Sequence, residues 1–474
     1  MKENSLDALF RPRSVAVIGA SEGVSATGAP KMGTAALEHL IAHGFDGSIY
    51  PVNPRGGVIQ GRLAYADLQA VPGEIDLALI VLPAESCVVA VRDCVAKGVR
   101  AAIVFASGFS EAGNEALEEE MRAVACAGGL RLVGPNTAGF VNMASKLVAT
   151  ISMIGSFRPF VSGGIAFVTQ SGALGGSLLG RAMEEGVGFS HWVATGNQAD
   201  IETAEYVDYL IDRPEVEAIA LFIEGVSDAE RFLAMAKKAA AAAKPVVVYK
   251  TGRSHVAAQA VASHTGALAG SDRIFDGICR QYGLVRVDDV SELFSTALAL
   301  SWLRDKMPRG RNVGIVSASG GICGVAADEC EAFGLNVPAL PVATQEKMQS
   351  FTPPFAALRN PVDVTGQIRS FPTGYQDVVR TVASDPSIDA LLLLITMAAE
   401  PRASFYGREI PAIAREIDKP TFVSWVGPVS MANVGFPMLA QSRVPNFKTV
   451  RQAVKAIRHA ADYRAFLLRR DGSG

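Results

Sequence analysis

The sequence lacks the marks of several large classes of protein. No apolar run reaches the roughly 18 residues expected of a membrane-spanning helix. The N-terminal residues have no apolar core like that of a signal peptide. The chain carries a formal charge of −3 and no basic run, which argues against a nucleic-acid-binding protein because such a protein needs a basic face. We therefore expect a cytoplasmic protein.

Signals for metal sites are also scarce. The six cysteines form no CxxC pair and the six histidines form no HxxxH pair, so no structural metal is expected. Scattered cysteines of this kind are typical of small buried side chains in a reducing compartment. Aromatic residues make up only 7% of the chain, whereas hydrophobic residues make up 49%. This composition favours large buried sheets with closely packed helices.

What the sequence does contain is three successive stretches in which apolar strands alternate with helices. The length of 474 residues agrees with about three domains, which we predict over 1–145, 146–305 and 306–474. Near-continuous apolar strands that alternate with helices indicate an α/β fold with doubly wound parallel sheets. In the first stretch, strands are predicted over 14–20, 47–54, 76–83, 101–109 and 130–136.

The strands of the first stretch end in loops that suit ligand binding. Right-handed crossovers bring the carboxyl ends of parallel strands to one edge of the sheet, where ligands bind. The loop residues at this edge include Gly19, Ser21, Asn53, Arg55, Pro83, Ser107 and Asn136.

The same loops depart from a dinucleotide site. The first turn reads GASEGVSATG instead of GxGxxG, and Asn53 stands where an NAD site has an acidic residue. A phosphate-rich ligand with another head group is therefore favoured over the NAD of a dehydrogenase. Helix N-termini would hold its phosphates. Lys31 and Arg55 offer additional positive charge, unless they are ordinary surface cations.

The second and third stretches each contain a strand that turns directly into a helix through small residues. Small residues at the start of a helix leave its first N–H groups free for an anion. The two segments look like copies of one unit, so the third stretch is expected to repeat the fold of the second. Residues 359–366 are predicted to form a compact turn with Asp363. The candidate anion-binding residues are Ser171 and Gly172 after the strand over 165–169, and Ser319, Gly320 and Gly321 after the strand over 313–317.

Two further residues of the second stretch stand out. Glu224 lies at the carboxyl end of a predicted strand over 217–226, where a carboxylate either takes part in chemistry or caps a neighbouring loop. His264 lies in the segment 250–271, KTGRSHVAAQAVASHTGALAGS, in which nearly all neighbouring side chains are small. This histidine is either an incidental surface residue on a mobile loop or a nucleophilic or proton-transferring group on a loop that moves.

Taken together, these motifs resemble the NDP-forming acyl-CoA synthetase family, the ADP-forming acetyl-CoA synthetase group, which is related to succinyl-CoA synthetase. The resemblance covers nearly the whole chain. Its most specific part is KTGRS followed by ASHTGALAGSD, with LFIEGV upstream. It also rests on SVAVIGAS, VLPAES, ASGFSE, GPNTAG, TQSGALG, ATGNQADI, SASGG and NPVDVTG. The resemblance implies a Rossmann-like CoA-binding domain followed by two flavodoxin-like domains of the succinyl-CoA synthetase type.

The resemblance also implies a role for each candidate residue. The first domain would bind CoA through the loops around Ser21, Asn53, Arg55, Pro83 and Asn136. His264 would be the phosphorylated histidine, and Glu224 would orient its ring. The helix N-termini at Ser171–Gly172 and at Ser319–Gly321 would neutralise the phosphate. The implied reaction converts acid, CoA and ATP reversibly to acyl-CoA, ADP and phosphate, through an acyl phosphate and a phosphohistidine.

One departure from the family pattern concerns the nucleotide. The family uses an ATP-grasp domain to bind Mg²⁺ and the nucleotide, and the sequence offers no candidate for one. We therefore expect a separate ATP-grasp subunit and either a hetero-oligomer or a homodimer, and assign no metal ligand in this chain. A second departure is Gln198 in GNQADI, where it stands in place of a charged residue. No Arg cluster marks a dicarboxylate site, so a small monocarboxylate is the favoured acid. A non-catalytic CoA- or acyl-CoA-binding regulator with the same fold is the alternative.

Overall fold

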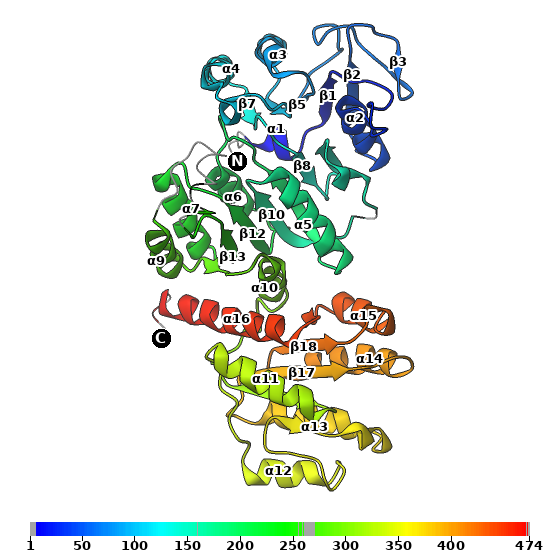
Figure 1. Ribbon diagram of the computed structural model, residues 1–474, viewed down its shortest axis with the longest axis vertical. Helices are drawn as coiled ribbons and strands as arrows, with labels where there is room; N and C mark the ends of the chain where they lie inside the picture. Colours follow the sequence, from blue (N-terminus) through cyan, green and yellow to red (C-terminus); the bar gives the residue numbers. More distant parts are fainter. Residues whose placement is uncertain are drawn as a thin grey trace. The chain divides into compact units, whose positions relative to one another are not determined.

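The computed structural model describes residues 6–158, 160–254, 256, 257, 259, 271–470 and 472. It divides into two compact units, one up to Arg286 and one from Val287 onward, and each is described here by itself. The first unit contains two five-stranded parallel arrangements, and the second unit contains one (Figure 1). The predicted α/β fold with three doubly wound domains is confirmed.

The first sheet is parallel throughout and has the order β2-β1-β5-β6-β7. Its central strands are fully buried because helices cover both faces, as expected for near-continuous apolar runs. All five strands predicted for this stretch are present. They are β1 (Ser14–Ile18), β2 (Ser48–Val52), β5 (Leu77–Ile80), β6 (Ala101–Val104) and β7 (Arg131–Val133). The helices are α1 (Asp7–Phe10), α2 (Met32–Ala42), α3 (Ala84–Lys97) and α4 (Glu115–Ala127), and a small hairpin is formed by β3 (Val58–Ile59) and β4 (Arg62–Leu63).

The second sheet has the order β14-β13-β12-β10-β11-β8-β9. Five of its strands are parallel, and β8 and β9 extend it as an antiparallel pair beside β11. The parallel strands are β10 (Ser162–Thr169), β11 (Phe189–Ala194), β12 (Ala218–Ile223), β13 (Val246–Lys250) and β14 (Val285–Arg286). The pair is β8 (Gly139–Asn142) and β9 (Leu147–Thr150). The helices are α5 (Gly172–Glu184), α6 (Thr203–Ile211), α7 (Ala229–Ala241) and α9 (Asp272–Tyr282).

The second unit holds the third sheet, in the order β16-β15-β17-β18-β19. The strands are β15 (Val313–Ser317), β16 (Val362–Asp363), β17 (Ala390–Thr396), β18 (Thr421–Val426) and β19 (Asn446–Phe447). The helices are α10 (Val290–Trp302), α11 (Gly320–Ala332), α12 (Val342–Gln349), α13 (Gly374–Ser384), α14 (Arg402–Glu416), α15 (Gly435–Gln441) and α16 (Val450–Arg470). Short 3₁₀ helices in the two units cover Ser110–Ala112, Met153–Ser156, Gly366–Ser370 and Val429–Met431.

The three sheets share one strand order. When the parallel strands of each sheet are numbered along the chain, the order is 2-1-3-4-5 in every case. The third stretch therefore does repeat the second, as the sequence predicts. In this topology the connections leave in opposite directions from the first and third strands, and ligands bind at the carboxyl end of that switch point. The switch points lie between β1 and β5, between β10 and β12, and between β15 and β17.

One segment differs from its predicted form. Residues 359–366 were expected to be a compact turn, but Val362 and Asp363 form the strand β16, paired with Val316 and Ser317 of β15. A strand of two residues is too short to show an apolar run, so only its pairing partners reveal it. The pairing places Asp363 at the carboxyl edge of the third sheet.

Other expectations concern cysteines, metals and membranes. Five of the six cysteines are buried, and Cys126 is exposed. Burial raises the pKa of the Cys94 thiol to about 12, so this side chain acts as a small hydrophobe. Among the described residues, no group of three or more His, Cys, Asp or Glu side chains is placed to hold a metal ion. Within the same part of the chain, no helix is both long enough and apolar enough to cross a membrane.

Candidate active site

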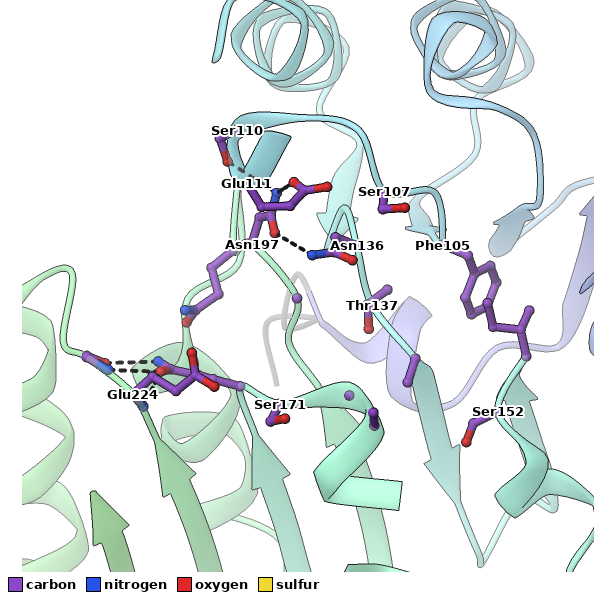
Figure 2. Close-up of a pocket in the computed structure, with 18 of the residues that line it drawn as sticks. Phe105, Ser107, Ser110, Glu111, Asn136, Thr137, Ser152, Ser171, Asn197 and Glu224 are labelled. Carbon is purple, nitrogen blue, oxygen red and sulfur yellow. Dashed lines mark hydrogen bonds between the residues drawn. The ribbon is translucent and has the colours of Figure 1, made fainter. Parts of the chain in front are cut away.

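A pocket of about 510 Å³ lies in the first unit, where loops of the first and second sheets meet (Figure 2). The first sheet contributes the segments that follow β6 and β7. The second sheet contributes the segments that follow β10, β11 and β12, so the pocket lies at the switch point between β10 and β12. The lining residues are Met32, Phe105, Ser107, Ser110, Glu111, Asn136, Thr137, Ala138, Ile151, Ser152, Gln170, Ser171, Gly172, Ala173, Gly196, Asn197, Gln198, Glu224, Gly225 and Ser227.

One wall of the pocket is the N-terminus of α5. The helix begins at Gly172, and the Ser171 side chain makes no capping hydrogen bond to it. Thr169 holds the turn, because its hydroxyl accepts a hydrogen bond from Ser171 N (3.1 Å) and donates one to Ser171 O (3.0 Å). The first N–H groups of α5 therefore point toward the pocket without a side-chain partner at the cap, which is the arrangement that binds anions.

Small residues bring this helix close to its neighbours. A Cβ atom on Gly172 would lie 3.0 Å from the Ala138 methyl group, and one on Gly175 would lie 2.5 Å from Cγ2 of Thr169. Larger side chains at these positions would push α5 away from β10 and from the segment after β7. The glycines of the TQSGALG motif thus have a packing role at the start of α5.

Glu224 stands beside this helix N-terminus. It follows β12 directly and is half-buried, and Figure 2 shows it on the same side of the pocket as Ser171, away from Phe105 and Ser152. Its backbone N–H donates a hydrogen bond of 2.6 Å to the side-chain oxygen of Gln170. A carboxylate and the start of a helix without a side-chain cap are thereby brought to the same part of one pocket.

Asn197 joins the two sheets above the pocket. Its side-chain nitrogen donates to Glu111 and, over 2.9 Å, to Glu118, and its oxygen accepts from Asn136 over 3.2 Å. Burial alone would raise the pKa of the Glu111 carboxyl. Hydrogen bonds from Asn197 and from the N–H groups of Gly108 and Phe109 outweigh that effect, so the pKa is lowered. Glu111 is therefore an ionised acceptor that orders the loop after β6.

The structure brings five of the candidate site residues into this pocket, together with Gln198, noted above as a departure from the family pattern. The five are Ser107, Asn136, Ser171, Gly172 and Glu224. His264 lies outside the described residues. Gln170, Glu111 and Asn197 were not singled out as site residues. Gln170 adjoins Ser171 in the TQSG turn, which was a usable signal, whereas Glu111 and Asn197 meet only through the packing of the two sheets.

The other candidates of the first domain lie at the carboxyl edge of the first sheet but do not line this pocket. Gly19 has φ +90°, and a Cβ atom there would overlap the carbonyl oxygen of Val81. The Asn53 side chain donates to Ala20 O (2.8 Å) and accepts from Arg55 N (2.9 Å). Asn53 thus orders the loops after β1 and β2.

Three further candidates at this edge expose their side chains. Lys31 and Pro83 are exposed at the residues before α2 and α3, and Arg55 is exposed after β2. The Ser21 hydroxyl lies 3.3 Å from that of Thr34 on α2. A ligand that approaches this edge would meet both helix starts, which suits a phosphate-rich molecule.

In the second unit, Ser319 precedes α11, which begins at Gly320 and is followed by Gly321. This helix start already has an anion of the protein beside it. A Cβ atom on Gly320 would lie 2.9 Å from a carboxylate oxygen of Asp363, and the other oxygen accepts from Thr365 N over 2.9 Å. The start of α11 therefore differs from the start of α5, because a carboxylate of the protein lies directly beside it.

Comparison with known families finds three matches, each of which covers the parallel strands of one sheet. Residues 13–143 match the CoA binding domain, residues 162–300 match the succinyl-CoA ligase like flavodoxin domain, and residues 313–465 match the Ligase-CoA domain. The pocket lies among residues of the first two matched regions and the segment between them.

Individual relatives are similar over most of the chain. The α subunit of acetate–CoA ligase (ADP-forming) I of Pyrococcus furiosus is 37% identical, and the match covers 96% of each chain. Acetate–CoA ligase (ADP-forming) I of Archaeoglobus fulgidus is 35% identical, and the match covers 95% of this chain and 63% of that protein. Among solved structures, dinucleotide-forming acetyl-coenzyme A synthetase 1 of Candidatus Korarchaeum cryptofilum with phosphate and ADP has a TM-score of 0.87, 31% identity and 98% coverage of both chains.

Proposed function

The chain belongs to the NDP-forming acyl-CoA synthetase family, and we propose that it is the α-type subunit of such an enzyme. It couples acid, CoA and ATP to acyl-CoA, ADP and phosphate in a reversible reaction. The observation that carries this proposal is the pocket in which the start of α5 and Glu224 meet the loops after β6 and β7. An anion site and a carboxylate thereby face the domain that matches the CoA-binding family.

The α5 N-terminus holds inorganic phosphate in this scheme. In the direction that consumes acyl-CoA, a phosphate oxygen attacks the thioester carbonyl, and the bond to sulfur breaks to release CoA and leave an acyl phosphate. The N–H groups that follow Ser171 stabilise the phosphoryl charge, because preorganised donors aimed at developing charge lower the barrier. Phosphoryl transfer depends mainly on such positioning and charge neutralisation.

His264 then accepts the phosphoryl group, and the acid is released. Glu224 would orient the imidazole and fix its tautomer, the role that a carboxylate plays beside a catalytic histidine. The small residues around His264 in the sequence suit a segment that carries the group to a second site. The CoA nucleotide would lie along the loops of Gly19, Ser21, Asn53 and Pro83, with Lys31 and Arg55 near its phosphates.

The nucleotide step needs a partner. The match covers 63% of acetate–CoA ligase (ADP-forming) I of Archaeoglobus fulgidus, so part of that protein lies outside the match. We assign ATP or ADP, with its Mg²⁺, to a separate ATP-grasp subunit. Ser319–Gly321 of α11 would offer a second helix start to the phosphoryl group during transfer.

The pocket also favours one class of acid. No lysine or arginine is present among the described residues that line it, whereas Phe105 and Ile151 give it an apolar side. A second carboxylate on the substrate would find no cation there and would face the charges of Glu111 and Glu224. A small monocarboxylate is therefore the proposed substrate.

The direct test is a panel of acids given to the chain together with its ATP-grasp partner, CoA and Mg·ATP, with CoA thioester and ADP as the measured products. Small monocarboxylates are expected to give both products, and succinate to give neither. CoA binding without thioester formation from any acid would instead support the non-catalytic regulator.

A further inference from the structure

The side-chain amide of Gln170 uses all of its hydrogen-bonding positions on its neighbours. Its oxygen accepts from the backbone N–H groups of Glu224 (2.6 Å) and Gly225 (3.0 Å). Its nitrogen donates to the carbonyl oxygen of Gly225 (2.9 Å) and to the hydroxyl of Thr203 (3.2 Å). An amide offers two donors and an acceptor oxygen with two lone pairs, so no position remains unused. Gln170 therefore forms hydrogen bonds to two successive residues, Glu224 and Gly225, of the segment after β12.

The direction of each hydrogen bond in this network is fixed. Gln198 has only an acceptor at its side-chain oxygen, which receives the Thr203 backbone N–H (2.7 Å) and the Thr203 hydroxyl (2.6 Å). The Thr203 hydroxyl has then given its proton to Gln198, so it must accept from Gln170. Gly225 O can only accept, and the two backbone N–H groups can only donate. A glutamate at position 170 would lack the donor that this arrangement requires.

The backbone of Gln170 adds to the connection. Its N–H donates to the carbonyl oxygen of Phe222 over 3.1 Å, which continues the pairing of β10 with β12 by one residue. The next residue is Ser171, at the start of α5. The chain thus places Gln170 between the anion-binding helix start and the carboxylate, with hydrogen bonds to the segments on both sides of the switch point.

We propose that Gln170 is a positioning residue for Glu224, and that Thr203 and Gln198 support it. This inference rests on the proposed function, because it assigns Gln170 a part in the same reaction. Gln170 holds Glu224 at a fixed place relative to Ser171. The phosphate site at the start of α5 and the carboxylate that orients the histidine therefore keep a constant separation. It acts on Glu224 through the backbone and not through the carboxylate.

The variant that tests this most sharply is Gln170→Glu, which keeps the size of the side chain and removes its donor. In the complex of the full chain with its ATP-grasp partner, we expect kcat for thioester formation to fall by at least about 30-fold, since the two hydrogen bonds to Gly225 O and to the Thr203 hydroxyl are lost together and a carboxylate oxygen is left against the Gly225 carbonyl. We expect KM for CoA to stay within about twofold, because the proposed CoA nucleotide loops belong to the other sheet. A kcat within about threefold of wild type, or a rise in KM alone, would overturn the proposal.

A second pair of variants guards against a general folding defect. Thr203→Ser keeps the hydroxyl and is expected to retain kcat within about threefold, whereas Thr203→Val removes it and is expected to lower kcat about tenfold, since it breaks the bond to Gln170 and the one to Gln198. Equal effects of the two substitutions on kcat would contradict a supporting role for the Thr203 hydroxyl, which bonds to Gln170 and Gln198.

Hydrogen exchange separates this inference from the proposed function. The amide protons of Glu224 and Gly225 are expected to exchange at least about tenfold faster in Gln170→Leu, which removes the oxygen that accepts from both, than in wild type, and this corresponds to the loss of about one hydrogen bond each. Unchanged exchange overturns the positioning role whether or not the complex has activity. If exchange is faster in the variant but the wild-type complex forms no thioester, the hydrogen bonds from Glu224 and Gly225 to Gln170 are supported and the proposed function is contradicted.

Discussion

Gly196 lies against Pro135 so closely that a Cβ atom on the glycine would overlap the carbonyl oxygen of the proline. The same oxygen accepts a hydrogen bond of 2.9 Å from Asn197 N. Gly196 has φ +64°, in the left-handed region that glycine adopts most readily. This contact fixes the segment after β11 against the segment after β7, and both segments line the pocket.

Gly196→Ala is therefore expected to destabilise the first unit. Gly186 is a matched control, because it also has a positive φ, +84°, but no atom lies within 4 Å of the place where its Cβ would be. Both substitutions pay for the left-handed backbone, and only Gly196→Ala adds the overlap. We expect its midpoint of thermal unfolding to lie at least about 5 °C below that of Gly186→Ala. Equal midpoints would show that the close approach to Pro135 is not rigid.

Glu224→Gln tests the carboxylate itself. The substitution keeps the shape of the side chain and the backbone bonds to Gln170 but removes the negative charge. We expect thioester formation to slow by about 100-fold or more, because loss of the carboxylate that orients a catalytic histidine has at least this effect, with no change in the unfolding midpoint. An unaltered rate would leave Glu224 with a purely structural role.

Asn53→Ala tests the loops assigned to CoA. It removes the hydrogen bonds to Ala20 and Arg55, so we expect KM for CoA to rise about tenfold, as expected for two lost hydrogen bonds, while kcat changes little. Gln69→Ala is a suitable control, since Gln69 is exposed in the same domain and bonds to Asp93. A fall in kcat with unchanged KM would place Asn53 outside the CoA site.

His191 predicts a pH dependence of stability. Burial lowers the pKa of this imidazole from 6.5 to about 4, with a smaller opposing effect from Glu215. Between pH 6.5 and pH 4 the unfolded chain binds a proton that the folded chain does not. The contribution of His191 to the free energy of unfolding is therefore fully present above pH 6.5 and is lost as the pH falls toward 4. The loss is about 3 kcal/mol from this group. Denaturant titrations across this range should show a shallower decline for His191→Gln, and parallel curves would contradict the assignment.

Local patterns in the sequence were enough to predict the three sheets and five residues of the pocket. The strands were predictable because buried parallel strands are continuous apolar runs. Ser171, Gly172 and Glu224 were predictable because each lies within three residues of the end of such a strand. β8 and β9 were missed because they form an antiparallel pair that joins the second sheet only through the contact of β8 with β11, a strand that comes later in the chain. The roles of Gln170 and Asn197 could not be predicted, since their partners lie 54 and 86 residues away.

The proximity of Asp363 to Gly320 likewise depends on pairing between β15 and β16. The two helix starts look alike in sequence, because both follow a strand through serine and glycine. Only the neighbouring strand shows that α11 has a carboxylate beside it. Residue type and order therefore predict where a site can be, whereas contacts between distant segments decide the charge around it.

The most direct test of the central claim is phosphoryl labelling of His264. The full chain with its ATP-grasp partner is incubated with Mg²⁺ and ATP labelled in the γ-phosphate, and the acid-labile label on the chain is located by peptide mapping. The proposed function predicts label at His264 in wild type, its discharge on addition of acid substrate and CoA, and its absence in His264→Ala. No label in wild type, or label that persists in His264→Ala, would contradict it.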